Sequence, residues 1–145
     1  MVLSVVHVVS PQPRGDTGGA QLHVADLAAA QVGVGTVTPR VVELGAKGYA
    51  ASLAALGVDA VTLDRPYAVE AVRRLSGLLA CGPVDLVHSH GYDADFLAGL
   101  AGLAGRSRPA WVATVHGFVT AGVVSRAKTA ANRRLLRHGP AAVIA

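Results

Sequence analysis

The chain has 145 residues, of which 52% are hydrophobic and 15% charged, and its formal net charge is +4. This length fits one domain, and this composition excludes a disordered segment. Residues 1–9 are apolar but too few to span a bilayer, and they lack the basic start of a secretory signal. Cys81 is the only cysteine, which excludes an intrachain disulfide, so we expect a cytoplasmic protein.

Apolar runs of strand length alternate with segments of helical periodicity along the chain. In chain order, the first half predicts a strand at 3–9, a glycine-rich loop at 15–19, a helix at 20–31, a strand at about 34–38, a helix at 49–56 and a strand at 58–63. Pro39 is expected to end the second strand. Gly57 suits the left-handed backbone position that follows a helix.

The second half continues the alternation. It predicts a helix from Pro66 to Leu79, a strand at 84–88, a helix that Asp93 caps and that runs to Leu103, a strand at 110–116, a helix at 122–138 and a last strand at 141–145. Parallel strands need crossovers, and both faces of their sheet must be covered. The pattern therefore predicts a Rossmann-like three-layer α/β/α domain with a mostly parallel, six-stranded sheet. Because residue 145 lies inside an apolar strand, we expect a truncated gene or a fragment boundary.

Ligands of an open parallel sheet bind beyond the carboxyl ends of its strands. At that edge Gly18 and Gly19 stand directly before a helix, where absent Cβ atoms let a ligand approach and the first N–H groups can bind a phosphate. A tight turn between strand and helix explains the same two glycines equally well. The loop matches neither the dinucleotide fingerprint nor a Walker-type phosphate loop.

Three histidines follow predicted strands at the same edge. His88 and His90 point to one side if their strand continues through Ser89, so they can converge with His116. A histidine placed there can hydrogen-bond sugar hydroxyls or a developing charge, which is the interpretation we favour. A zinc site of three imidazoles is the alternative, but neither a carboxylate ligand nor supporting groups are evident, so we expect no metal. Ser89 is not in a Gly-x-Ser-x-Gly turn, which argues against a self-sufficient hydrolase.

The charges are distributed unevenly. Residues 1–105 hold 6 basic and 9 acidic side chains, whereas residues 106–145 hold 7 basic ones and none that is acidic. Arg126, Arg133 and Arg137 share one face of the predicted helix 122–138. This face is either solvated or in contact with an anion, such as a lipid surface, a phosphate or another domain. An aromatic content of 4% disfavours a surface that stacks nucleic-acid bases.

Five segments together resemble the retaining GT-B glycosyltransferases of family 4, and specifically their N-terminal, acceptor-side domain. The segments are Val6–Ser10 with Gly18–Val24, Val37–Pro39, Asp85–Tyr92 with Ala94–Ala98, Thr114–Gly117, and Ala142–Ala145. Each is a weak signal alone, but all five stand in the order and spacing of the family. The resemblance extends over the whole chain.

The resemblance implies transfer of a hexosyl group from a nucleotide-sugar donor to a sugar or lipid acceptor, with retention of configuration and without a metal or other cofactor. It implies that Gly18 and Gly19 approach the donor diphosphate, that His116 lies at the transfer site, and that His90 and Tyr92 face the acceptor. The basic phosphate clamp and paired glutamates of the family's donor domain have no counterpart among these 145 residues.

We therefore expect the isolated chain to be inactive without a C-terminal donor domain or partner chain. Two other classes of function stay open. One is a non-catalytic remnant or binding module for an acceptor, an anionic lipid surface or a partner domain, which includes peripheral contact with the inner face of the membrane. The other is a small zinc-dependent hydrolase that uses His88, His90 and His116.

Overall fold

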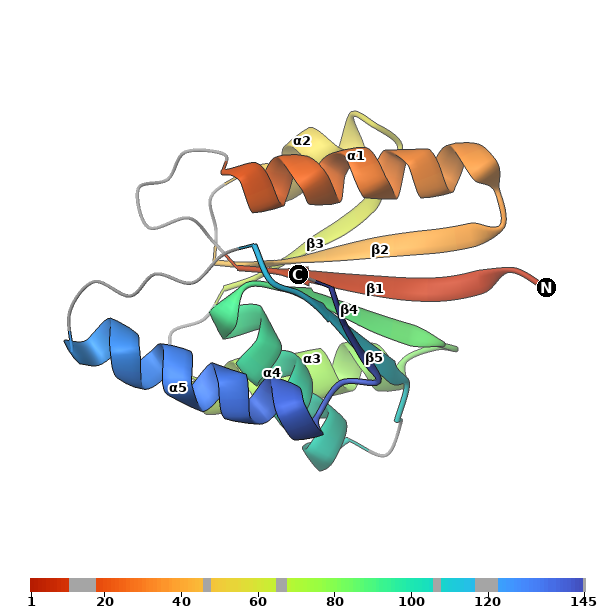
Figure 1. Cartoon of the computed structure of the whole chain (residues 1–145). Coiled ribbons are helices and arrows are strands. Elements are labelled where there is room, and N and C mark those ends of the chain that lie inside the picture. Colours follow the sequence, from red (N-terminus) through yellow and green to blue (C-terminus); the bar gives the residue numbers. More distant parts are fainter. Residues whose placement is uncertain (11–17, 46–47, 65–67, 106–107, 117–122, 145) are drawn as a thin grey trace.

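The computed structural model describes residues 1–10, 18–45, 48–64, 68–105, 108–116 and 123–144 (Figure 1). The described strands are β1 (Leu3–Val9), β2 (Val37–Leu44), β3 (Asp59–Leu63), β4 (Leu86–His90), β5 (Ala110–Thr114) and β6 (Ala142–Ile144). The described helices are α1 (Gly19–Val34), α2 (Tyr49–Ala54), α3 (Ala68–Ala80), α4 (Tyr92–Ala104) and α5 (Val123–His138). Strands and helices alternate strictly, as the sequence predicts.

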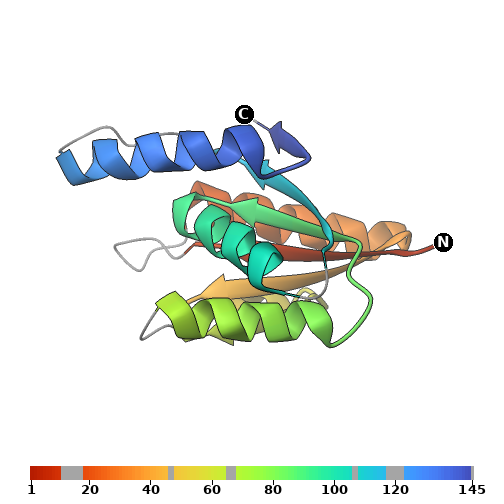
Figure 2. The ribbon, with the colours of Figure 1, turned by 90° about the horizontal axis from the view of Figure 1, so that it is seen from below.

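The six strands form one parallel sheet in the order β3-β2-β1-β4-β5-β6. Helices α1 and α2 cover one face, and α3, α4 and α5 cover the other, which makes three layers (Figures 1 and 2). This confirms the predicted Rossmann-like α/β/α fold. The order reverses at β1, because the chain passes from β3 on one edge back to β4 beside β1, and such a switch point is where ligands of open parallel sheets bind.

The apolar core is divided by the sheet into two clusters. Val6 and Val8 of β1 point toward α3 and α4, where Leu75 and Leu97 pack against them. Val9, on the opposite face, packs with Val24 and other buried residues of α1 and α2. Because side chains alternate along a strand, β1 supplies both clusters, and its odd-numbered residues face α1.

The second strand differs from the prediction. Val34 belongs to α1, and Pro39 is a buried residue inside β2 instead of the end of that strand. Pairing between β2 and β3 begins only at Arg40, so at Pro39 the strand pairs with β1 alone. A proline is tolerated at such an edge, because no ladder bond to a second neighbour is lost there.

The fourth and fifth strands also differ. β4 starts at Leu86 and continues to His90, two residues beyond the predicted end, while β5 ends at Thr114 and leaves His116 beyond it. The residue before α4 is Gly91 and not Asp93, which lies in the first turn. Gly91 has a φ of 96°, and a Cβ there would meet the hydroxyl of Ser10 at 3.2 Å. That hydroxyl accepts a hydrogen bond from the N–H of Ala94, so Ser10 caps α4 from a distant strand end.

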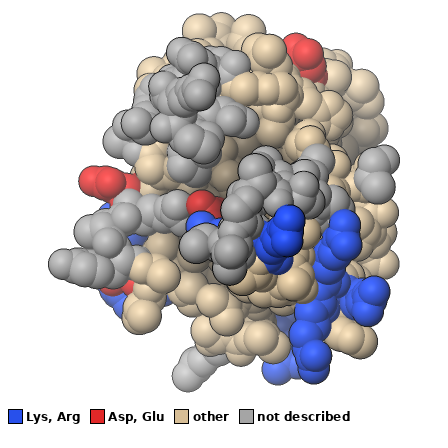
Figure 3. All heavy atoms as spheres, turned by 60° about the vertical axis from the view of Figure 1, so that its left-hand side comes forward, with Lys and Arg blue, Asp and Glu red and all other residues tan. Residues whose placement is uncertain are grey.

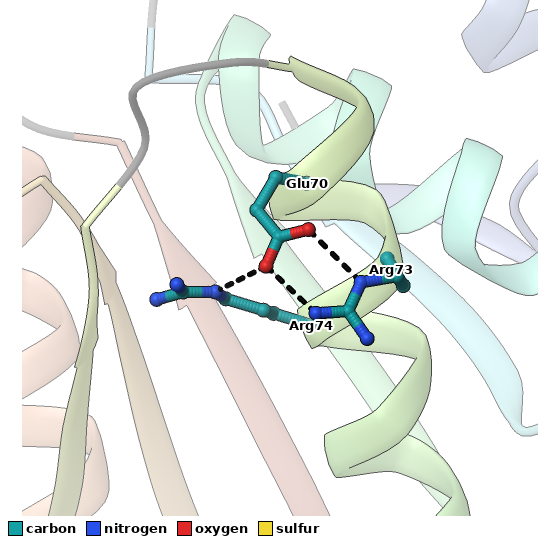
Figure 4. A network of polar contacts seen from close by, with 3 residues as sticks. All are labelled: Glu70, Arg73 and Arg74. Atoms are coloured by element: carbon teal, nitrogen blue, oxygen red, sulfur yellow. Dashed lines mark hydrogen bonds and ion pairs between the residues drawn. The ribbon is translucent and has the colours of Figure 1, made fainter.

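Surface charges on α3 form a small network (Figure 4). Glu70 accepts hydrogen bonds from Arg73 at 2.8 and 2.9 Å and from Arg74 at 2.8 Å. These two guanidinium groups lower the pKa of Glu70 to about 2. Among the described residues, no helix is long and apolar enough to cross a membrane.

Candidate functional site

Imidazole rings from three strand ends and one helix gather on the α1 face of the sheet. β1 and β4 are neighbours whose register pairs His7 with His88 and Val9 with His90, so His7, His88 and His90 point to the same side. His116 follows β5, and His23 lies in α1 above them. The rings of His90 and His116 are 5.4 Å apart, and those of His23 and His116 also 5.4 Å. The predicted convergence of His88, His90 and His116 is therefore present.

Hydrogen bonds connect four of the side chains in series. His7 Nε2 lies 2.9 Å from Gln31 Oε1 of α1, and His7 Nδ1 lies 3.3 Å from His90 Nε2. His90 Nδ1 in turn lies 3.1 Å from His116 Nε2. His7 and His90 are fully buried, whereas His116 is exposed. The series thus leads from under the last part of α1 to the solvent at the carboxyl edge of the sheet. We call Gln31, His7, His90 and His116 the imidazole chain.

His88 lies beside this chain without belonging to it. Its Nε2 is 2.7 Å from the hydroxyl oxygen of Thr114, and its ring centroid is 4.1 Å from that of His90. The two rings are tilted by 37° and pack against each other. His88 is therefore a packing partner of the chain, held by the strand β5 next to it.

Burial keeps these rings uncharged near neutral pH. It lowers the pKa of His88 to about 4, with further lowering by His7 and other nearby imidazoles. Burial also lowers the pKa values of His7, His90 and His116, and nearby rings add to the effect because a second positive charge is unfavourable there. Neutral imidazoles each have one N–H and one lone pair, so they can act as hydrogen-bond donors and acceptors at once.

Three of the rings also lie close enough to be considered for a metal ion. Ring nitrogens of His7, His88 and His90, one from each, are all within 4.8 Å of one another. Neutral imidazoles are common ligands of zinc. The 3.3 Å between His7 Nδ1 and His90 Nε2 is also explained by a hydrogen bond between the two rings, which needs no ion. The absence of a metal stays a prediction.

The glycines predicted to approach a phosphate lie at the start of α1. Gly18 precedes the helix, and its N–H donates to Gln21 Oε1 at 3.0 Å. The first helical hydrogen bond joins the N–H of Leu22 to the carbonyl of Gly18, so the N–H groups of the three residues between them have no acceptor within the helix. A Cβ at Gly19 would meet no described atom within 4 Å. No described residue therefore crowds the backbone at Gly19, and His23 follows one turn later.

The other predicted site residues lie apart from the imidazole chain. Tyr92 begins α4, and its hydroxyl lies 3.2 Å from that of Thr129 in α5, on the far side of the sheet from α1. Arg126, Arg133 and Arg137, with Arg134, line a hollow of about 680 Å³ along α5. Figure 3 shows basic side chains gathered on one side of the molecule. The structure therefore joins His90 to His116 but not to Tyr92 or to the arginines.

A second buried polar system occupies the opposite face of β4. The Ser89 hydroxyl donates to Asp95 Oδ1 at 2.6 Å and accepts from the indole N–H of Trp111 at 2.8 Å. Asn132 of α5 donates to Asp95 Oδ2 at 3.0 Å. Burial raises the pKa of Asp95 to about 6, against the lowering effect of these hydrogen bonds. The system attaches α4 and α5 to the sheet.

Sequence reasoning missed three residues of the histidine site. His7 was visible as the only polar side chain within the apolar run Val5–Val9, which is a signal of a buried hydrogen bond. Gln31 and His23 had no such signal, because both are isolated polar residues of a largely apolar helix without a distinct polar face. Their proximity to His7 and His116 depends on where α1 crosses β1.

Comparison with known proteins agrees with this architecture. The family model of Glycosyltransferase Family 4 matches residues 17–145. A search among curated proteins gives no significant match.

Solved structures share the fold at low sequence identity. Alr3699/HepE from Anabaena, in complex with UDP, is similar with a TM-score of 0.72 and 16% identity, over 97% of this chain and 37% of that chain. A glycosyltransferase from Rickettsia africae ESF-5 has a TM-score of 0.69 and 15% identity, over 94% of this chain and 35% of that chain. A protein from Listeria monocytogenes assigned as a UDP-N-acetylglucosamine 2-epimerase has a TM-score of 0.66 and 18% identity, over 93% of this chain and 36% of that chain.

These likenesses show the fold, and this chain spans little more than a third of each of those proteins. The sequence match is more specific, because it extends over most of the chain, from the start of α1 to the last strand. The chain belongs to glycosyltransferase family 4 and has the fold of a GT-B N-terminal domain.

Proposed function

We propose that this chain is the acceptor-side domain of a glycosyltransferase that moves a hexosyl group from a nucleotide sugar to an acceptor, with retention of configuration. The observation that carries the proposal is a row of neutral imidazoles that ends at the exposed His116, beside the open N-terminus of α1. A site of this kind can receive a donor diphosphate and a sugar hydroxyl next to each other. The membership in family 4 supports it.

The proposed roles follow from position. Gly18 and Gly19 border the donor diphosphate, because the first N–H groups of α1 and its positive dipole end point out there. His116 hydrogen-bonds the transferred sugar or balances the charge that develops as the donor bond breaks. His90 orients His116 through the hydrogen bond between their rings. Tyr92, the first residue of α4, borders the acceptor.

The donor is proposed to be bound mainly by a second domain. HepE was solved with UDP and, separately, with UDP and glucose, and this chain covers 37% of it. A basic phosphate clamp is not found in the present sequence. We therefore expect no sugar transfer by the 145 residues alone and recovery of transfer when a donor domain is supplied. Turnover by the isolated chain would contradict this.

The test of His116 uses that two-domain enzyme. His116→Ala is expected to lower turnover per folded molecule by about a hundredfold, because removal of one transition-state contact commonly costs that much. The melting temperature should fall by only a few degrees, because the ring is exposed and the one hydrogen bond lost is that to His90. His138→Ala, which removes an exposed histidine from the end of α5, is the matched control and should leave turnover unchanged. Near-normal turnover of His116→Ala would leave His116 without a catalytic role.

A second proposal concerns α5, as a contact for an anionic surface such as acidic lipid headgroups. Arg126, Arg133, Arg134 and Arg137 line one hollow, and no acidic residue occurs between 106 and 145. Each basic side chain near an anionic membrane contributes about 1 kcal/mol at low ionic strength. Binding of this kind would also fit a non-catalytic module, so it does not depend on sugar transfer.

Vesicle sedimentation tests the second proposal. Replacing Arg126, Arg133 and Arg137 with Gln should weaken binding to acidic vesicles about a hundredfold, and added salt should weaken the wild-type binding too. Lys128→Gln removes a charge from the other side of α5 and should have a much smaller effect. Binding that ignores both lipid charge and salt would overturn the proposal.

A further inference from the structure

The imidazole chain has a direction, because each neutral ring offers one donor and one acceptor. With the Gln31 amide oriented so that its oxygen faces His7 Nε2, this nitrogen carries the proton, because a carbonyl oxygen only accepts; the opposite amide orientation would reverse every proton in the series. His7 Nδ1 is then a bare acceptor, which requires the proton on His90 Nε2. The same reasoning puts a lone pair on His90 Nδ1 and the proton on His116 Nε2. The remaining nitrogen, His116 Nδ1, carries a lone pair and no proton.

We propose that Gln31, His7 and His90 are positioning residues that hold His116 in the Nε2–H tautomer, so that its unprotonated Nδ1 is the nitrogen offered to a ligand at the edge of the sheet. The group that fits this nitrogen is a hydrogen-bond donor, such as a sugar hydroxyl. The tautomer is a property of the chain as it stands. Its use with a sugar hydroxyl rests on the proposed function.

The same series decides which ring can gain a proton. The lone pairs of His7 Nδ1 and His90 Nδ1 are both used inside the chain, so protonating either ring breaks a buried hydrogen bond. Protonating His116 on Nδ1 breaks no hydrogen bond among the described residues and leaves its Nε2–H donated to His90. His116 is also the exposed member, so water can solvate the charge. Within the imidazole chain, a proton or a developing positive charge is therefore directed to His116, although burial and the neighbouring His23 lower its pKa.

Nuclear magnetic resonance of the isolated chain tests this without any activity. Long-range proton–nitrogen spectra of the imidazole rings distinguish a protonated from a bare ring nitrogen. At pH 7.5 we expect His7, His90 and His116 to be protonated on Nε2 and bare on Nδ1. A proton on Nδ1 of His116 in the wild type would overturn the proposal.

Three variants separate positioning from packing. Gln31→Leu removes the acceptor at the buried end and should turn His116 into a mixture of tautomers, whereas Gln31→Glu keeps an accepting oxygen and should restore the single form. Thr114→Val removes the buried hydrogen-bond partner of His88, which lies outside the chain, and it should leave the His116 tautomer unchanged. An unchanged His116 spectrum in Gln31→Leu would contradict the proposal. If Gln31→Leu does not fold, the tautomer of His116 measured in the wild type still tests the proposal.

Zinc provides a second check. One equivalent of Zn²⁺ is expected to leave the ring spectra unchanged, because zinc could bind His7 Nδ1 and His90 Nε2 together only by displacing the proton that the proposal puts between them. If the ring signals of His7, His88 and His90 shift together when zinc is added, the three rings form a metal site, and the tautomer assignment is overturned. In the two-domain enzyme, Gln31→Leu should lower the rate with its Km less affected. An altered tautomer with an unaltered rate would reject the proposed role of His116 and leave the tautomer assignment intact.

Discussion

Strand β4 places two buried polar systems back to back. His88 and His90 point toward α1, and Ser89 between them points toward α4 and α5, where it joins Asp95. The imidazole chain ends at the exposed His116, whose Nδ1 has no hydrogen-bond partner in the described part of the chain. The Asp95 system is closed among residues of β4, α4, β5 and α5, and its one unpartnered buried atom among the described residues is Asn132 Oδ1. The first face carries the proposed ligand site, whereas the second attaches α4 and α5 to the sheet.

The largest effect on stability is expected at Asp95. Asp95→Ala leaves the buried Ser89 hydroxyl and the Asn132 amide without their acceptor, which should reduce the free energy of unfolding by about 3 kcal/mol. Asp26→Ala, which removes an exposed carboxylate from α1, should cost almost nothing. Chemical denaturation measures both. Equal stabilities of the two variants would show that the Asp95 hydrogen bonds do not stabilise the attachment of α5 to the sheet.

The two faces should respond to acid with opposite signs. The folded-state pKa of His88, about 4, lies below its ordinary 6.5, so this ring makes the fold less stable as pH falls through that window. The folded-state pKa of Asp95, about 6, lies above its ordinary 3.8, so this carboxyl makes the fold more stable as pH falls from about 6 to 4. In the wild type these two contributions partly cancel.

Asp95→Asn removes the second contribution and leaves the first. Its free energy of unfolding should therefore fall more steeply than that of the wild type between pH 6 and pH 4, by about 2 kcal/mol. Denaturation curves at four or five pH values measure the two slopes. Parallel curves for wild type and variant would mean that Asp95 is ionised in the fold throughout this range.

Substitutions at two separate glycines test how tightly the residues around the Asp95 system are packed. A Cβ at Gly139 would lie 2.3 Å from Cζ3 of Trp111, the residue whose indole donates to Ser89. Gly139→Ala should reduce stability by about 2 kcal/mol through this overlap. Gly102→Ala, in α4, meets no described atom within 4 Å and should increase stability by up to about 1 kcal/mol. If Gly139→Ala leaves the stability unchanged, the Trp111 side chain can move aside without destabilising the fold.

The smallest effect is expected at the surface network of α3. Glu70→Gln removes an acid whose pKa is lowered by two guanidinium groups, and that stabilisation is present above pH 4.5 and lost as pH falls toward 2. Water and salt screen these charges, so the melting temperature at neutral pH should not change measurably. A decrease as large as that of Asp95→Ala would contradict the difference between buried and exposed networks.

Local sequence patterns determined much of this protein. The apolar periodicities predicted the order and type of all eleven elements, because hydrophobic spacing within a strand or helix depends on near neighbours only. The alternation along a strand also predicted that His88 and His90 share a side. The left-handed backbone at Gly57, with a φ of 73°, followed from its place after a helix.

Only the tertiary structure decided how the site is assembled. His7 lies beside His90 because β1 pairs with β4, more than eighty residues away, and Gln31 reaches His7 because α1 packs over β1. The polar residues Ser89 and His90 read as a turn in the sequence, yet they end a buried strand because both faces of the sheet supply them with partners. Strand order and hydrogen-bond partners are set by contacts between distant segments, and no local pattern encodes them.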